Sequence, residues 1–393
     1  MESKLPKKIL LIEMSPFPFH VGGGYAHLCL LSKGLIEEGH EVHILSAKPS
    51  KDYKMLDYPA EVILHNVGMR HKMFGKGNRF FAYLHRMFFE LSFVLSAKKK
   101  IKEIKPDIIN TQSLITTALP CTLLKKPFVA TQHGVFMKGF KELWDKRGRQ
   151  DVSFIGKIYD KLEKYNSKYC KEVIGVNQTV VDYYSKYTKS SLIGNSIDIK
   201  PYDKIRVVRK EDRYLFLGRI SEEKGLDYLL DALRIVDKEL NRDIEFIIAG
   251  SGNEAYIDSL KSKSNNFTHI TVNYAGPVYG EAKLKLYKSA NIFVLPSMFE
   301  SFGIVLLEAM AAGCGIIASN CSGPKEIVKP EFGLLVDYTN EEERVNNLAA
   351  ALIQSLSWDE GIGLAAREEV EKYDYKIAIQ KYIKVYERLE ASK

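Results

Sequence analysis

Short runs of apolar residues alternate along the chain with longer stretches in which apolar positions recur at helical spacing. A run of four to six apolar residues between polar ones is typical of a buried strand, and a 3.6-residue period is typical of an amphipathic helix. Strands and helices that alternate in this way predict a mostly parallel sheet with helices on both faces. The predicted fold class is therefore α/β.

The alternation occurs twice. In the first half, strands are predicted at 9–14, 42–46, 62–67, 107–111, 128–131 and 173–176, and helices at 25–38, 80–104 and 154–169. In the second half, strands are predicted at 214–217, 244–249, 270–274, 292–295, 315–318 and 334–336, and a final helix at 376–389. Residues 195–212 show no period, so we predict domains at 1–198 and 199–373, followed by a C-terminal segment at 374–393.

The predicted helix 80–104 has apolar residues on two sides. One stripe predicts the face that packs on the core, and it consists of Phe80, Leu84, Met87, Leu91 and Leu95. Phe89 and Phe93 fall on the other side, and Lys98, Lys99 and Lys100 follow them. Two interpretations stay open: the two phenylalanines pack under a loop beside solvated lysines, or this side lies on an anionic membrane surface.

Length and composition agree with a globular protein of two or three domains, with 393 residues, 46% hydrophobic and 27% charged. No segment approaches the roughly 18 apolar residues of a membrane span, and the N-terminus does not resemble a signal peptide, so a cytosolic protein is expected. The five cysteines are scattered without metal-ligand spacing, which predicts buried thiols.

The net charge of +8 is unevenly distributed. Residues 1–200 carry 32 Lys and Arg against 19 Asp and Glu, whereas the remainder carries 25 against 30. A basic half and a mildly acidic half indicate that the two halves meet different partners. Nucleic acid is not expected to be one of them, because no basic recognition motif or aromatic RNA-binding signature occurs.

Three consecutive glycines, Gly22, Gly23 and Gly24, follow the first predicted strand and precede a helix. Glycines at such a point let the backbone approach a ligand and aim its N–H groups at an anion. A tight turn between strand and helix explains them equally well, so both interpretations stay open.

A second motif runs from Gly218 to Gly225 and follows the predicted strand 214–217. In open α/β sheets, ligands bind beyond the carboxyl ends of the strands. The fork of Arg219 and the point charge of Lys224 suit a diphosphate there. The alternative is a pair of solvated loop charges.

The stretch from Glu300 to Glu308 follows the predicted strand 292–295 and enters an apolar helix. A carboxylate among apolar residues is costly unless it is paired or hydrogen-bonded. Hydroxyls of a sugar and a ribose would satisfy both glutamates, and the amides of Gly303 and Ile304 would point at a phosphate. A buried salt bridge is the alternative.

Three further features change this interpretation little. Gly250-Ser251-Gly252 resembles a dinucleotide fingerprint, but no acidic residue stands about 20 positions on, so a structural turn is expected. His133 follows the predicted strand 128–131, where structural and functional roles are both open. The chain contains no Asp-x-Asp pair, so no carboxylate-bridged metal is expected on the diphosphate.

Together these motifs resemble the retaining glycosyltransferases of the GT-B fold that include glycosyltransferase family 4. The resemblance spans almost the whole chain and is densest from Tyr214 to Asp337. The matching pieces occur in the order Gly22-Gly23, 39–42, His133, 195–198, 218–225, 250–252, 300–308, 323–326 and 333–336.

The resemblance implies two Rossmann-like domains facing across a cleft, with the acceptor in the first domain and the nucleotide sugar in the second. It also implies that the final helix crosses back to the first domain, and that the reaction retains anomeric configuration without an essential metal. The donor would be a nucleoside diphosphate sugar, UDP or GDP, and no cofactor is expected. Base recognition is expected near 276–279, and the acceptor is a sugar, a lipid or a lipid-linked sugar.

The resemblance implies roles for the matched positions. Arg219 and Lys224 would neutralise the diphosphate, Glu300 would bind the donor sugar, Glu308 would bind the ribose, and His133 would lie beside the sugar. The residues expected at the donor comprise Gly22, Gly23, Gly24, Gly218, Arg219, Lys224, Gly276, Pro277, Val278, Glu300, Ser301, Phe302, Gly303, Ile304 and Glu308, with Arg219, Lys224, Glu300 and His133 expected to be catalytic.

Some positions depart from the family pattern: Ser196 and Ser301 stand where Gly is usual, and Gly315 where Pro is usual. The expected acceptor loops at 69–78 and 136–152 match no known motif. Two rival functions stay open, a sugar-nucleotide 2-epimerase on this fold and a non-catalytic sugar-nucleotide binding protein.

Overall fold

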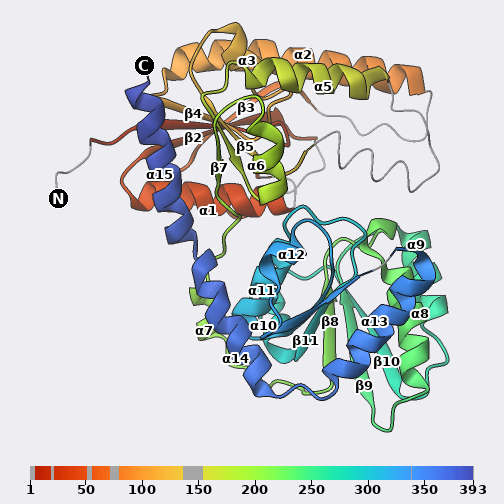
Figure 1. Ribbon diagram of the computed structural model, residues 1–393. Coiled ribbons are helices and arrows are strands. Elements are labelled where there is room, and N and C mark those ends of the chain that lie inside the picture. The colour runs from red at the N-terminus through yellow and green to blue at the C-terminus, as the bar shows by residue number, and fades with distance from the viewer. Residues whose placement is uncertain are drawn as a thin grey trace. The chain divides into compact units, whose positions relative to one another are not determined.

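The computed structural model describes residues 5–18, 22–50, 55–70, 79–135, 154–337 and 339–392, with the side chains of 79–83 and 154–155 left out. The chain divides into two compact units (Figure 1). Unit 1 combines Met1–Asn195 with Tyr375–Lys393, and unit 2 is Ser196–Asp374. Each unit is built on its own parallel sheet.

Unit 1 contains a seven-stranded parallel sheet among its described residues, in the order β3-β2-β1-β4-β5-β6-β7. Its strands are β1 (Lys8–Ile12), β2 (Glu41–Lys48), β3 (Ile63–Arg70), β4 (Ile108–Thr111), β5 (Val129–Gln132), β6 (Glu172–Gly175) and β7 (Ser190–Leu192). Its helices are α1 (Gly23–Glu37), α2 (Arg79–Ile104), α3 (Leu119–Leu123), α5 (Phe154–Ser167), α6 (Gln178–Tyr184) and α15 (Tyr375–Ala391).

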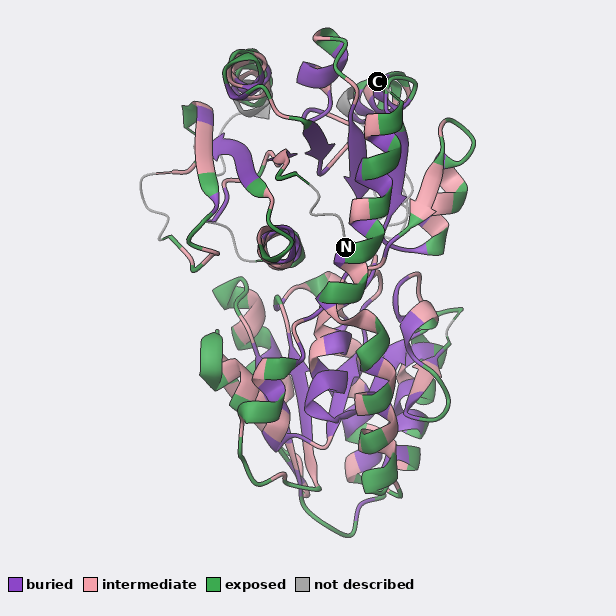
Figure 2. Cartoon of the chain, turned by 90° about the vertical axis from the view of Figure 1, so that its left-hand side faces the viewer, coloured by how far each residue is buried: buried purple, intermediate pink, exposed green. Residues whose placement is uncertain are grey.

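The core of unit 1 has one layer on each face of this sheet, because alternate side chains of a strand point to opposite faces. Leu10 and Ile12 of β1 pack with α2 and α3, whereas Ile9 and Leu11 pack with α1 and α15. The inner strands are buried, whereas the edge strands β3 and β7 are mostly half-buried or exposed, as are the outer helix faces (Figure 2). Helices α1 and α15 approach closely at Gly34, where an added Cβ would lie 2.2 Å from Cγ1 of Ile379.

Unit 2 contains a six-stranded parallel sheet among its described residues, in the order β10-β9-β8-β11-β12-β13. Its strands are β8 (Arg213–Leu217), β9 (Ile244–Ala249), β10 (Ile270–Gly276), β11 (Ile292–Leu295), β12 (Gly315–Ser319) and β13 (Gly333–Val336). Its helices, with the short 3₁₀ turns η1 and η2, are α7 (Lys200–Lys204), η1 (Glu222–Lys224), α8 (Leu226–Asp237), α9 (Glu254–Lys263), α10 (Gly280–Ser289), α11 (Ile304–Ala312), α12 (Pro324–Ile327), α13 (Glu341–Ser355), α14 (Glu360–Glu369) and η2 (Val370–Tyr373).

Two Rossmann-like α/β units with parallel sheets confirm the predicted fold class. Each strand predicted from an apolar run is present, and β9 and β11 have the predicted bounds. Strand β7 was not predicted, because Ser190–Leu192 is three residues long and starts with two serines. It forms because its backbone pairs with β6 at the edge of the sheet.

The predicted core face of α2 is wrong. Phe89 and Phe93 are the buried side chains, whereas Leu91 and Leu95 are more than half exposed. Helix α2 turns this side inward because it packs on β3, where Gly68 (φ +78°) leaves room for the Phe93 backbone. A periodic pattern cannot decide which of two apolar sides meets the sheet. The side chain of Phe80 lies outside the described part.

The outward side of α2 is consequently apolar and then basic. Its large exposed side chains are Met87, Phe88, Leu91 and Leu95, between 51% and 57% exposed, and we call these four the α2 outer face. Lys99 and Lys102 continue the same side toward the C-terminal end of the helix. Within the described ranges, no helix is long and apolar enough to span a bilayer.

Candidate active site

Unit 2 changes strand order at β8, which lies between β9 and β11. The chain proceeds from β8 to β9 on one side and returns later to β11 on the other. Ligands of doubly wound sheets bind beyond the carboxyl ends of the strands at such a switch point. The segments that follow β8 and β11 are 218–225 and 296–303; the first is the motif from Gly218 to Gly225, and the second leads into the motif from Glu300 to Glu308.

The two segments are joined by an ion pair. Nζ of Lys224 lies 2.7 Å from Oε2 of Glu300, and the two side chains are only 17% and 18% exposed. The backbone N–H of Met298 donates to the carbonyl of Glu223 at 2.8 Å. An added Cβ at Gly225, which has φ +70°, would lie 2.1 Å from the carbonyl oxygen of Pro296. A glycine is therefore required for the two segments to meet.

Arg219 occupies the same segment but is far more open. Its guanidinium is 71% exposed and lies 3.2 Å from Oε1 of Glu223. The structure thus gives the two predicted cations separate carboxylate partners, one exposed and one mostly buried. An exposed ion pair is weak, so the Arg219 guanidinium is easily available to another anion.

Glu308 lies about one turn inside α11, which begins at Ile304. Its carboxylate accepts a hydrogen bond from Tyr287 Oη at 2.9 Å and forms an ion pair with Lys283. The side chain is 12% exposed. Sequence reasoning did not find Lys283 or Tyr287, because they come from α10 and carry no local motif. The salt-bridge alternative therefore describes both glutamates, because Glu300 pairs with Lys224 and Glu308 with Lys283.

The N-terminal end of α11 faces the same edge of the sheet. Gly303 has φ +90° and precedes the first helical residue, Ile304. The first N–H groups of a helix have no carbonyl partner within the helix and carry a partial positive charge. Phe302, by contrast, is 6% exposed and packs edge-on against Tyr373, so its side chain belongs to the core. Ser301 is half-buried.

Other predicted positions serve the backbone. An added Cβ at Gly250 would lie 1.7 Å from the carbonyl oxygen of Gly218, and one at Gly252 would lie 2.0 Å from that of Ile220. These glycines therefore hold the segments after β8 and β9 together, as the structural-turn interpretation expected. Gly276 has φ +67° and accepts a hydrogen bond from Gly250, and Pro277 and Val278 follow it beyond β10.

Unit 1 has its own switch point, between β1 and β4. Gly22 is the residue before α1, and its φ of 163° is an extended conformation that any residue adopts. An added Cβ at Gly22 or Gly24 would meet no described atom within 4 Å. The described structure therefore offers no packing reason for these glycines. Their backbone is open at the N-terminal end of α1.

His133 follows β5 and is held from two sides. Its Nε2 lies 3.2 Å from Oε1 of Gln112, which follows β4. The ring of His27, from α1, meets it edge-on with centroids 4.8 Å apart. Burial lowers the pKa of His133 to about 4, so the ring is neutral at pH 7. Gln112 could have been predicted, since it occupies the same position after its strand as His133; His27 has no such signal.

Comparisons with known proteins agree with this architecture. Residues 21–200 match the family Glycosyltransferase Family 4, and residues 200–373 match Glycosyl transferases group 1. An uncharacterized glycosyltransferase of Methanocaldococcus jannaschii is 27% identical, over 95% of this chain and 99% of its own. A phosphatidyl-myo-inositol mannosyltransferase of Mycolicibacterium smegmatis is 29% identical, over 95% of this chain and 92% of its own. The structure of sucrose-phosphate synthase from Thermosynechococcus elongatus has a TM-score of 0.77 at 20% identity and covers 98% of this chain and 100% of its own.

The two parallel-sheet units have the GT-B type of fold, and the family matches show that the protein is a glycosyltransferase. The chain belongs to the group 1 glycosyltransferases, with a family 4 N-terminal half. The resemblance identified from the sequence motifs is thereby confirmed.

Proposed function

We propose that the protein transfers a sugar from a nucleoside diphosphate sugar, UDP- or GDP-linked, to a hydroxyl group of an acceptor, with retention of anomeric configuration and without an essential metal. The bond between the anomeric carbon and the diphosphate oxygen breaks, and the acceptor oxygen bonds to that carbon on the same face. The departing diphosphate takes the acceptor proton. The observation that carries the proposal is the mostly buried Lys224–Glu300 pair at the switch point of unit 2.

The pair suits a sugar bound to a diphosphate. A fixed ammonium in a partly water-excluded site stabilises charge that develops on a leaving group. When donor binds, Lys224 contacts the diphosphate and Glu300 accepts hydrogen bonds from sugar hydroxyls. Arg219 adds a second cation from the open side, and the N–H groups of Gly303 and Ile304 face the phosphates. Glu308, which forms an ion pair with Lys283, accepts hydrogen bonds from the ribose hydroxyls.

In unit 1, the open backbone at Gly22 and Gly24 and the neutral ring of His133 are the groups that we propose to contact the substrates. A neutral imidazole can donate from one ring nitrogen and accept at the other. His133 therefore contacts hydroxyl groups of the transferred sugar without bringing a positive charge. The acceptor binds to unit 1. Of the expected acceptor segments at 69–78 and 136–152, residues 71–78 and all of 136–152 lie outside the described residues.

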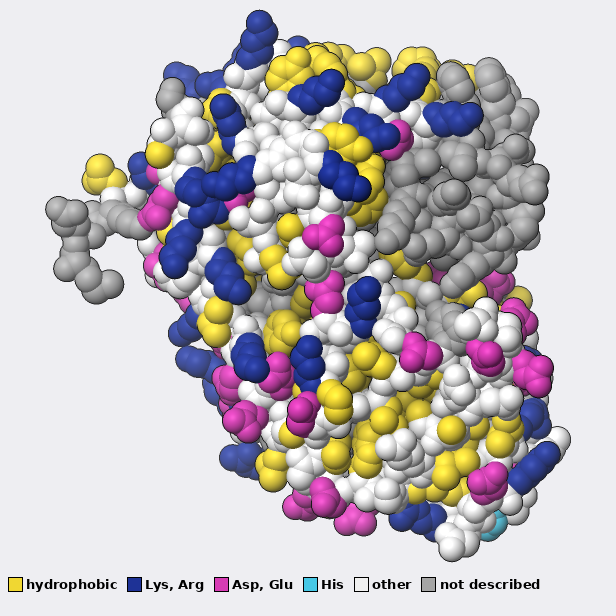
Figure 3. All heavy atoms as spheres, in the orientation of Figure 1, with side chains coloured by type: hydrophobic (Ala, Val, Ile, Leu, Met, Phe, Trp, Pro, Cys, Tyr) yellow, Lys and Arg dark blue, Asp and Glu magenta, His cyan; other side chains and the backbone are white. Residues whose placement is uncertain are grey.

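We further propose that the acceptor is a lipid or a lipid-linked sugar, and that the protein works in the cytoplasm against an anionic membrane. The α2 outer face presents four large apolar side chains beside lysines, which is what a surface-lying contact requires (Figure 3). Flotation with anionic vesicles, reduced by salt and by L91Q/L95Q, supports the contact. Equal flotation of this variant contradicts it.

Calorimetric titration with UDP, GDP and ADP, followed by their sugars, tests the donor. Binding of one nucleotide that is lost in K224A supports the site. Product anomers resolved by NMR decide retention, and turnover in excess chelator decides metal dependence. A changed sugar nucleotide formed from donor alone indicates the epimerase. Tight donor binding without turnover on any lipid or sugar acceptor indicates the non-catalytic protein.

A further inference from the structure

Unit 1 has a recess at the edge of its sheet opposite to His133 and Gln112. A cavity of about 620 Å³ opens where the chain enters β4, β5 and β6, at the amino ends of these strands. This volume lies within the usual range of small-molecule pockets. We call it the lysine recess, after Lys125, Lys126, Lys168 and Lys171 in its lining.

The lysine recess is strongly positive. Its lining contains one carboxylate, that of Asp107, whose Oδ2 already accepts a hydrogen bond from the backbone N–H of Lys8 at 2.8 Å. The four lysines are all exposed, and the described part of the chain offers none of them an ion pair. Four ammonium groups around one concave surface raise the local concentration of anions.

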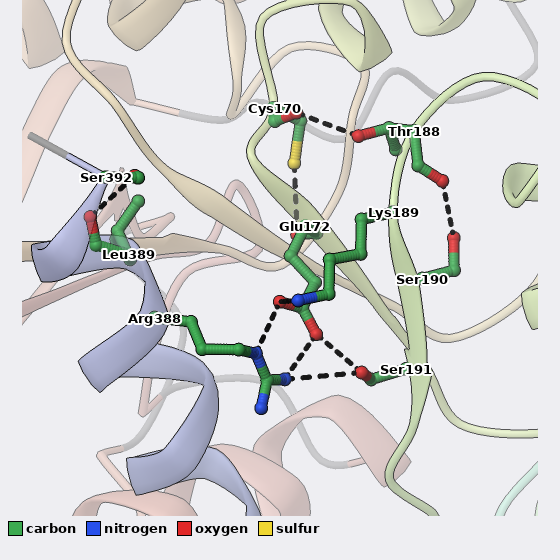
Figure 4. Close-up of polar contacts among 9 residues, drawn as sticks. All are labelled: Cys170, Glu172, Thr188, Lys189, Ser190, Ser191, Arg388, Leu389 and Ser392. Atoms are coloured by element: carbon green, nitrogen blue, oxygen red, sulfur yellow. Dashed lines mark hydrogen bonds and ion pairs between the residues drawn. The ribbon is translucent and has the colours of Figure 1, made fainter.

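The nearest buried carboxylate does not offset this charge. Glu172 follows Lys171 in the chain, but its Oε2 accepts from Nε of Arg388 at 3.1 Å, and Ser191 and Lys189 contact it as well (Figure 4). Burial opposes ionisation, yet these hydrogen bonds and charges hold the pKa of Glu172 below its ordinary value. Glu172 is thus neutralised by partners outside the lysine recess.

A simpler explanation would be that the lysines cap helices. Helices α2, α3 and α5 end beside the recess, and cations are commonly placed at such ends. In the described structure, however, the carbonyl of Ile104 at the end of α2 accepts from Nζ of Lys8 at 3.4 Å. No Nζ of the four lysines donates to a described carbonyl group. Capping therefore accounts for Lys8 and leaves the four lysines unexplained.

Phosphate oxygens match this surface, because several ammonium groups can each donate to one compact anion. We propose that the lysine recess binds a phosphate group, monoester or diester, at a site separate from the donor diphosphate site. Such a group belongs either to a soluble phosphate ester or to a lipid headgroup. Helix α2 connects the recess to the α2 outer face, since Leu95 lies about 14 Å along the helix from Ile104, two residues before Pro106 in the recess lining.

The test is calorimetric titration of the full chain, saturated with UDP, with inorganic phosphate and glycerol phosphate. A parallel arm measures flotation with phosphatidylcholine vesicles with and without phosphatidylglycerol. The variant K125Q/K126Q/K168Q/K171Q is expected to lose about tenfold or more in affinity, equivalent to one charge-assisted hydrogen bond. The control K204Q/K238Q/K261Q/K329Q removes the same charge from unit 2 and is expected to bind as wild type does.

If the recess variant loses binding of soluble phosphate but still floats with anionic vesicles, the ligand is a soluble ester. If the recess variant loses flotation but still binds soluble phosphate, the ligand is a lipid headgroup. The proposal is overturned if neither probe binds, if both quadruple variants lose binding equally, or if UDP abolishes phosphate binding. The last outcome places the phosphate at the donor site. UDP affinity, measured in the same protein, reports separately on the proposed donor function.

Discussion

Lys224 and Glu300 stand 76 residues apart in the chain, and their charged atoms lie 2.7 Å apart with less than a fifth of each side chain exposed. The pair joins the segments after two neighbouring strands, β8 and β11. Each charged group thus has the other as its partner. Under the proposed function, donor binding exchanges this internal contact for contacts with a diphosphate and a sugar.

Removing the Lys224 ammonium is expected to slow transfer strongly. K224A should lower turnover by roughly 10²–10³, because a preorganised charge on the leaving group contributes about 3–4 kcal/mol to the barrier. The turnover of R219A should fall by a similar factor if the exposed guanidinium of Arg219 contacts the diphosphate. Steady-state kinetics with the cognate donor measures both. K238A, a change of the same charge on the exposed end of α8, is the control; wild-type turnover of K224A would refute the assignment.

The two glutamates are expected to differ. E308Q should weaken binding of the free nucleoside diphosphate, since the proposed function places Glu308 at the ribose. E300Q should lower turnover and leave that affinity nearly unchanged. K283A should resemble E308Q, because it removes the cation that pairs with this carboxylate. Calorimetry with nucleotide alone, combined with turnover numbers, separates the effects; a reversed pattern would exchange the two roles.

Glycines at the start of α1 are expected to matter for activity and not for folding. G24A should unfold at the same free energy as wild type or at one higher by up to about 1 kcal/mol, since alanine favours a helix. Its donor affinity or turnover should fall, because the added methyl group fills the open space beside the backbone where the ligand would approach. Urea unfolding and kinetics give both numbers. In contrast, G34A should destabilise the protein, because its methyl group collides with Ile379; a stable, fully active G24A contradicts the ligand role.

His133 should make stability depend on pH. Its folded-state pKa of about 4 lies below the ordinary 6.5, so the unfolded chain binds the proton more readily between these values. As pH falls from 6.5 toward 4, wild type should lose stability relative to H133Q, by up to about 1.4 kcal/mol per pH unit. Denaturant melts of both proteins across this window measure the difference. Parallel stability curves would show that the imidazole is not desolvated.

Arg388 should anchor α15 to the sheet. R388A leaves the buried Glu172 carboxylate with fewer partners, so unfolding should become easier by about 1–3 kcal/mol. The loss should be greatest at neutral pH, where Glu172 is charged, and should shrink in acid. K384A, from an exposed position on the same helix, is the matched control. Equal stability of the two variants would indicate that Lys189 and Ser191 suffice.

The positions of the motif residues in unit 2 were predictable because these residues are contiguous motifs after strands. Arg219, Lys224, Glu300 and Glu308 lie where the strand pattern placed them, at the carboxyl ends of β8 and β11 or just inside α11. Lys283 was not predictable, since it reaches Glu308 only through the packing of α10 on α11. Spacing along the chain carries no information on such partners.

The two sides of α2 show that the sequence also cannot predict which side of a helix is buried. Its amphipathic pattern predicts the helix correctly, but the pattern also predicts that the side containing Leu91 and Leu95 faces the core, and this side is exposed. Both sides are apolar, and Gly68 of β3 decides between them by admitting the Phe93 backbone. Local periodicity predicts that a helix forms, whereas the side of the helix that packs inward depends on the strands that it contacts.

Helix α15 also has a consequence for biosynthesis. Its residues Tyr375, Ile379, Tyr382, Val385, Tyr386 and Leu389 complete one core layer of unit 1, although they are translated after all of unit 2. A nascent chain can therefore fold unit 2, which is continuous in sequence, before α15 is available to complete the core of unit 1. Nascent unit 1 exposes the apolar side of α1 during that interval, and truncation before Tyr375 should make the protein dependent on chaperones.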